Sequence, residues 1–194
     1  MRKMFRLPLI AMMIMTVCFA TACSTADNTK PSAGDNSAAA QIDSKVDDAL
    51  QKLYTSTPAA LELAKVAKGI LVFPDIIKGG FVVGGQYGEG ALRKYGKTAG
   101  YYNTVSASYG LQAGAQKFGY ALFFIDDASL AYLNKSGGWE IGVGPNVTVV
   151  DAGVAKNLST TTARSGVYAF FFDQKGLMAG LGIQGSKISR IDPK

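Results

Sequence analysis

The stretch AKGILVFPDIIKGGFVVGGQYGEGAL, residues 67–92, decides the fold. From Gly69 onward, β-branched and aromatic side chains dominate and alternate with turn signals, which is typical of strands. Strand glycines mark bulges, tight bends or close backbone approach, and such bends let a sheet curl toward a barrel. We favour this curved sheet over a phosphate-binding loop, because the stretch contains no G-x-x-x-x-G-K-[ST] and no G-x-G-x-x-G that opens a helix after a strand. The glycines are Gly79, Gly80, Gly84, Gly85, Gly88 and Gly90.

Strand signals continue to the end of the chain. Residues 177–183 show the two-residue period of a sheet with one packed face. Residues 173–176 (DQKG) have the length of a hairpin turn, so we expect the last strands to pair locally. Residues 127–134 (DASLAYLN) predict one short inserted helix. The predicted strands are residues 70–73, 81–87, 91–95, 101–108, 111–116, 120–125, 139–143, 147–151, 167–173, 177–183 and 187–191.

Two helices are predicted before the strands. In the first, apolar residues recur at three- and four-residue spacing, at Ile42, Val46, Ala49, Leu50 and Leu53. This stripe is expected to face the core, because the acidic residues between them would be repelled by anionic head groups. In the second, Thr57 is the N-cap, Pro58 the first helical residue and Gly69 the end signal. We therefore expect an α+β domain over residues 41–194, a strongly curved, mostly antiparallel β-sheet or partial barrel with two N-terminal helices and one short inserted helix.

The N-terminus has the pattern of a bacterial lipoprotein signal. A positively charged region precedes an apolar stretch at residues 7–20, and small residues stand directly before Cys23. We expect residues 1–22 to be a signal peptide and Cys23 to carry lipid, with acyl chains such as palmitate. Residues 24–40 have no large apolar side chain, so residues 23–40 are predicted to be the lipidated cysteine and a flexible tether.

Two alternatives to lipidation stay open. One is an ordinary secretory signal that is cut after Ala22 and leaves Cys23 free. The other is a retained membrane anchor, although about fourteen apolar residues fall short of the roughly twenty that span a bilayer as a helix.

Composition limits the chemistry of the domain. The chain has no histidine and two cysteines, and Cys18 would leave with the signal peptide. This excludes Ser-His-Asp and Cys-His nucleophile pairs, His-ligated zinc and a disulfide in the domain. Asp126, Asp127 and Glu140 are the notable carboxylates, but adjacent residues in a strand point to opposite faces and make no ready acid–base pair. We expect no catalysis, no cofactor and no metal.

The charge balance does not indicate nucleic acid as a partner. The formal net charge of +6 includes three basic residues of the predicted signal peptide. Without these three, 17 of the 20 basic residues remain, against 14 acidic residues, so the net charge is +3. This small excess permits a basic face toward anionic lipid without requiring one.

Four stretches occur in a fixed order: residues 67–92, SYGLQAGAQ at 108–116, DASLAYLNKSGGWEIGVGPNVTVVDAGVAK at 127–156, and VYAFFFDQKGLMAGLGIQGSKISRI at 167–191. Together they resemble the SYLF domain, and in particular its bacterial lipoprotein branch, over residues 46–191. The resemblance implies a lipid-binding module, since eukaryotic members bind phosphoinositide-containing membranes and some bind actin. The chain departs from the family in two places. Its residues 42–53 are acidic where eukaryotic members have a basic amphipathic segment, and residues 101–104 (YYNT) replace a Trp that precedes Ala-Pro in many relatives.

The expected function is that of a lipid-anchored envelope protein whose SYLF-like domain binds phospholipid, a similar amphiphile or a membrane surface. Because Ser24 and not Asp follows Cys23, we expect the periplasmic face of the outer membrane, with exposure at the cell surface as an alternative. The alternative function is an envelope assembly protein that docks a protein partner and uses lipid only as its tether. The predicted ligand-binding residues are Lys78, Arg93, Lys94, Lys97, Tyr101, Tyr102 and Lys117.

Overall fold

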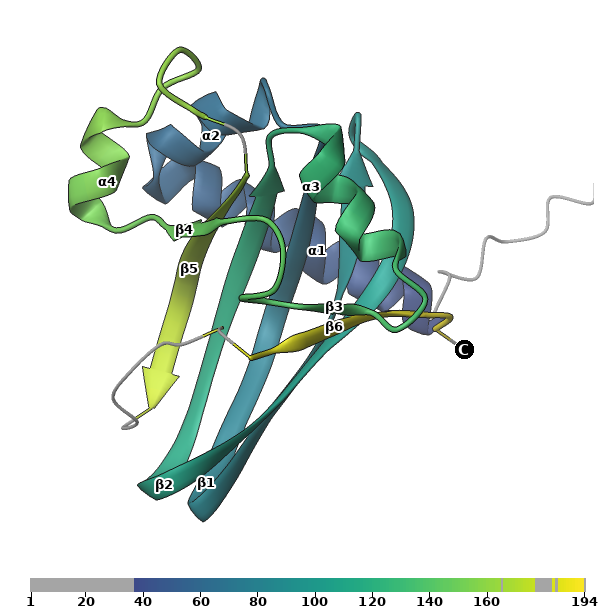
Figure 1. Ribbon diagram of the computed structural model, residues 1–194, viewed down its shortest axis with the longest axis vertical. Helices are drawn as coiled ribbons and strands as arrows, with labels where there is room; N and C mark the ends of the chain where they lie inside the picture. The colour runs from purple at the N-terminus through teal and green to yellow at the C-terminus, as the bar shows by residue number, and fades with distance from the viewer. Residues whose placement is uncertain (1–36, 165, 177–182, 184, 194) are drawn as a thin grey trace, which may run out of the picture. The chain divides into compact units, whose positions relative to one another are not determined.

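The computed structural model describes residues 37–164, 166–176, 183 and 185–193 and confirms the α+β class (Figure 1). Two N-terminal helices cover the outer face of a strongly curled, mostly antiparallel sheet, which has six strands among the described residues. The predicted signal peptide, Cys23 and most of the predicted tether lie outside the described residues. The strand predicted at 177–183 also falls outside them, except for its last residue.

Both predicted N-terminal helices form. The first, α1 (Ala38–Ser56), begins ahead of its apolar stripe because the Ser37 hydroxyl accepts the Ala40 N–H at 3.2 Å. The second, α2 (Pro58–Ala64), follows Thr57 and starts with proline at its first position, as predicted, but the Thr57 side chain makes no capping hydrogen bond and the helix ends well before Gly69. The stripe that α1 buries against the sheet is Ile42, Val46, Ala49 and Leu53.

Two very long strands, β1 (Gly69–Lys94) and β2 (Lys97–Phe124), form one antiparallel hairpin. The six shorter strands predicted between residues 70 and 125 are therefore wrong as separate elements. The glycines do not end the strands, and the ladder passes through them with three register shifts. Tyr95 and Gly96 join the strands with φ values of 51° and 75°, and two positive φ angles are typical of a type I′ hairpin turn.

The hairpin is folded over on itself, so that the second half of β1 crosses the first half (Figure 1). The backbones approach too closely for side chains. A Cβ added at Gly80 would lie 2.3 Å from the Gly84 Cα, and one added at Gly90 would lie 1.9 Å from the Val72 carbonyl oxygen. Glycine therefore allows the crease. We term residues 77–83 of β1 the tip, which lies at the bottom of Figure 1.

The other strands extend the sheet on the far side of β2. There β5 (Val167–Gly176) and β6 (Lys187–Ile191) pair antiparallel with different parts of β2. The short β4 (Val147–Val149) runs parallel to β5, and β3 (Trp139–Glu140) pairs with β6. The hairpin turn predicted at residues 173–176 is wrong, because pairing with β2 carries β5 through these residues.

Short helices lie between the later strands. The inserted helix is confirmed as α3 (Asp127–Ala131), which continues into the 3-10 helix η1 (Tyr132–Asn134). A further helix, α4 (Ala152–Asn157), has no counterpart in the sequence prediction. Both α3 and α4 start after an aspartate, Asp126 and Asp151, whose carboxylate accepts backbone N–H bonds.

Hydrophobic cores lie on both sides of the sheet. The core inside the curl includes Phe73, Phe118, Tyr120, Phe124 and Trp139. The core between the helices and the outer face includes Val46, Leu53, Leu63, Phe123 and Phe170. Every buried member of these cores lies at residue 42 or later. A chain of residues 24–194, which lacks the predicted signal peptide and lipid anchor and which we term the soluble chain, therefore keeps every residue of the two cores. Within the described residues, no helix is long and apolar enough to cross a membrane.

Candidate functional site

The tip exposes three large apolar side chains to solvent. Phe81 is 78% exposed, Ile77 65% and Val83 62%. Ile77 and Phe81 project from the same, outer face of β1, because they are four residues apart in a part of the ladder without a register shift. Single exposed apolar residues are ordinary, but three on one projection form a candidate contact surface.

The backbone at the tip is strained. Val82, between two exposed residues, has φ of 64°, in the left-handed region that a β-branched residue rarely adopts. A register shift in the pairing with β2 falls at the same place. Such strain persists only where the surrounding structure imposes it, and it is enriched at functional positions. Here the crease imposes it, and the crease is also what presents Phe81 and Val83 to solvent.

Two lysines stand beside the tip on the outer face. Ile77 of β1 pairs with Lys117 of β2, and Lys117 pairs in turn with Lys175 of β5. Directly opposed residues of antiparallel strands share a face, so the three side chains form a row across the sheet. Lys117 and Lys175, which we term the basic row, are both exposed. Like charges directly opposite each other are unfavourable, so an anionic partner would stabilise the basic row.

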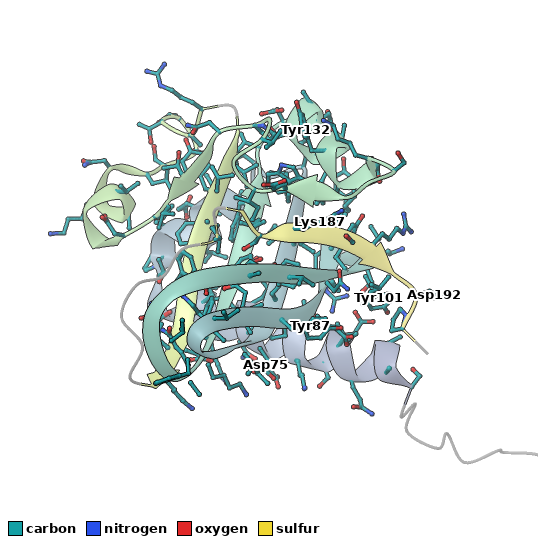
Figure 2. All side chains as sticks on the ribbon, turned by 60° about the horizontal axis from the view of Figure 1, so that its bottom comes forward. Asp75, Tyr87, Tyr101, Tyr132, Lys187 and Asp192 are labelled. Carbon is teal, nitrogen blue, oxygen red and sulfur yellow. The ribbon has the colours of Figure 1, made fainter. Side chains whose placement is uncertain are left out.

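Asp75 neutralises part of this charge. Its carboxylate accepts from Lys117 Nζ at 2.8 Å and lies 3.4 Å from Lys45 Nζ of α1. Burial alone would raise the pKa of the Asp75 carboxyl, but the hydrogen bonds and charges of the two lysines outweigh it and hold the pKa below its ordinary value. Asp75 therefore stays ionised beside α1 (Figure 2). Lys175 has no ion-pair partner among the described residues, so the site keeps a net positive charge.

The structure does not gather the predicted ligand-binding lysines into one site. Lys117 lies beside the tip. Lys94 and Lys97 oppose each other next to the hairpin turn, at the other end of the folded hairpin. Lys78 pairs with Gln116, whose side chain is buried, so Lys78 projects from the inner face and not from the outer face.

Arg93, Tyr101 and Tyr102, also predicted to bind ligand, take part in packing. The Arg93 side chain is 10% exposed and donates to Asp43 at 2.8 Å and to Asp47 at 2.6 Å. The Tyr101 hydroxyl donates to the Asp43 carboxylate at 2.8 Å, and Tyr102 is buried inside the curl. The guanidinium is thus occupied by carboxylates of α1, and a lipid phosphate would have to displace them.

The sequence prediction missed Lys175 and the exposure of the tip. Lys175 was assigned to a turn, and Phe81 and Val83 to an ordinary strand. A usable signal does exist, because the large apolar residues 81–83 stand directly between two Gly-Gly pairs, where a crease leaves them without a packing layer. Cys23, the predicted lipid-anchor residue, lies outside the described residues.

Compared with known proteins, the chain matches no protein-family model, and no curated protein matches it closely enough to establish a relationship.

Proposed function

We propose that this chain is a lipid-anchored envelope protein whose domain binds phospholipid bilayers through the tip and the basic row. The observation that carries the proposal is the exposure of Phe81, Ile77 and Val83 on one projection with Lys117 and Lys175 beside it. The lipoprotein signal before Cys23 and the resemblance to the SYLF domain point in the same direction. The proposed location of the anchored protein is the periplasmic face of the outer membrane.

The chemistry of the site matches the two layers of a bilayer surface. Apolar side chains at the tip would enter the acyl boundary, and full burial of such a side chain contributes about 1.5–3 kcal/mol. The lysines of the basic row would remain at the level of anionic head groups, where each contributes about 1 kcal/mol. The total is modest for a free domain. A lipid on Cys23 would hold the domain near a bilayer, and that raised effective concentration makes a modest affinity sufficient.

Vesicle flotation of the soluble chain tests the proposal without the anchor. Vesicles of phosphatidylethanolamine with anionic phosphatidylglycerol should carry the protein at low salt. Binding should fall at about 0.5 M NaCl, where charges are screened within a few ångströms. Phe81→Asp should abolish flotation, because it places a charge on the side chain that would enter the acyl region. Lys117→Gln combined with Lys175→Gln should weaken flotation and remove most of its salt dependence.

Tyr95 supplies the matched control. It is an aromatic residue that is 89% exposed at the hairpin turn, away from the tip. Tyr95→Asp should leave flotation unchanged, so that the loss in Phe81→Asp can be assigned to the position and not to a lost surface aromatic. If Phe81→Asp floats as the wild type does, the tip is not the membrane contact. If the wild type fails to float at low salt, membrane binding by the domain is refuted.

A further inference from the structure

A cavity of about 720 Å³ lies between α2, α4 and the strand pair β4 and β5. These elements lie together at the upper left of Figure 1, away from the tip. Its apolar lining includes Phe170 and Phe171 of β5, Val150, which follows β4, and Ala59 and Ala155 of the two helices. This volume falls within the range of about 300–1,000 Å³ that is typical of small-molecule sites with mostly apolar walls.

The rim of the cavity carries one positively and one negatively charged side chain, which differ in their partners. Among the described residues that line it, Lys156 is the one cation and Asp151 the one anion. Asp151 is engaged as the N-cap of α4, where its Oδ1 accepts the N–H groups of Gly153 and Val154 at 2.8 Å each. Lys156 is exposed, and within the described part of the chain it forms no ion pair.

We propose that this cavity binds a single-chain anionic amphiphile. Its acyl chain would lie against Phe170 and Val150, which face the helical side of the sheet, and its anionic head group would pair with Lys156. One apolar floor and one rim cation suit a ligand with one chain and one head. The ligand would enter as a monomer from water, so the inference does not rest on membrane contact by the tip.

Calorimetric titration of the soluble chain tests the cavity with two probes of equal chain length. The first is sodium dodecanoate and the second is dodecyltrimethylammonium, each kept below its micelle concentration. The wild type should bind dodecanoate more tightly than the cationic probe. Lys156→Glu should weaken dodecanoate binding by about tenfold or more and strengthen binding of the cationic probe, because the rim charge is reversed. Ala155→Trp, which fills the cavity, should remove binding of both probes.

Controls separate this site from the tip and from general charge effects. Lys97→Glu, the same charge reversal at an exposed lysine beside the hairpin turn, should bind dodecanoate as the wild type does. So should Phe81→Asp, which distinguishes failure of the cavity from failure of the membrane contact. If Ala155→Trp lowers the melting temperature, Ala59→Trp fills the cavity from α2 in its place. The inference is overturned if the wild type does not bind dodecanoate, or if neither Lys156→Glu nor the cavity-filling variant changes its affinity.

Discussion

Asp43 Oδ1 accepts a hydrogen bond from Arg93 Nη1 at 2.8 Å, and this contact joins α1 to the returning half of β1. The same carboxylate also accepts from Thr98 Oγ1 and from the Tyr101 hydroxyl, each at 2.8 Å. One aspartate on the first helix therefore holds three donors from both strands of the folded hairpin. Its position keeps the crossed hairpin against the helical layer.

Removing this carboxylate should destabilise the domain. In Asp43→Ala the three donors lose an acceptor, and the largely buried Arg93 keeps its bonds to the Asp47 carboxylate and to the backbone carbonyl oxygen of residue 43. We expect the free energy of unfolding of the soluble chain to fall by about 2–3 kcal/mol, since a hydrogen-bonded charge loses its main partner. Urea unfolding measures the loss. Asp48→Ala, at an exposed position of the same helix, should stay within about 0.5 kcal/mol of the wild type, and an equal loss there would contradict the assignment.

A methyl group at the crossing of β1 should be far more harmful than one elsewhere in the same strand. In Gly90→Ala the new Cβ would lie 1.9 Å from the Val72 carbonyl oxygen, so the backbone must move. We expect a loss of about 3 kcal/mol or failure to fold, at or beyond the upper end of overpacking costs. In Gly85→Ala the nearest atom, the Ser106 carbonyl oxygen, is 3.6 Å away, and stability should barely change. Similar melting temperatures for the two variants would refute the close crossing.

Relieving the backbone strain at the crease should stabilise the domain. Val82 adopts φ of 64°, and the left-handed region costs an L-residue about 1–2 kcal/mol. Val82→Gly removes this cost, while the greater freedom of glycine in the unfolded chain takes back about 0.5–1 kcal/mol. A net gain of about 0.5–1 kcal/mol in the free energy of unfolding should follow. Chemical denaturation checks it, and Val83→Gly, at a neighbouring residue without the positive φ, should show no gain.

The cap of α3 should make stability depend on pH in the acid range. Burial would raise the pKa of the Asp126 carboxyl, but hydrogen bonds from Ser129, Gly166 and Ala128 outweigh it and leave the pKa lowered. A lowered folded-state pKa means that the contribution is complete above the ordinary aspartate value and is lost as pH falls through the folded-state value. The stability advantage of the wild type over Asp126→Asn and Asp126→Ser should therefore be constant near neutrality and shrink below about pH 4.

Unfolding in urea at several pH values between about 7 and 2.5 measures this advantage. Both variants replace the carboxyl by a neutral side chain that can still accept the capping hydrogen bond. This side chain does not titrate between about pH 7 and 2.5. They should therefore show the same trend relative to the wild type. An advantage that does not change across the whole range would mean that the Asp126 bonds favour neither protonation state.

The elements that were correctly predicted are those specified by local chemistry. The stripe of Ile42, Val46, Ala49 and Leu53 and the proline at the start of α2 are signals within the helices themselves, so they can be recognised without knowing the tertiary contacts. The long strands could not be found in this way. Glycines such as Gly80, Gly84 and Gly90 often mark the ends of strands. Here they lie inside a strand, because another part of the same strand passes close to them.

The candidate site was predictable only in part, for a similar reason. Lys117 is basic in any interpretation, but its row with Ile77 and Lys175 exists only through the pairing of three strands. The sequence of residues 173–176 is typical of a turn, but pairing with β2 holds these residues in a strand. Arginine is a residue type that often binds phosphate, so the sequence favours Arg93 as a ligand contact. Only the packing of α1 shows that its guanidinium is paired with Asp43 and Asp47.

The crossing of β1 over itself also has a mechanical consequence. Two strand segments in direct backbone contact resist bending more than a single segment does. A load applied at Phe81 would be carried back along both layers, through the glycine contacts that hold them together, toward the helix beside Asp75 and Arg93. We therefore expect the contact between the two halves of β1 to stiffen the projection that carries the tip.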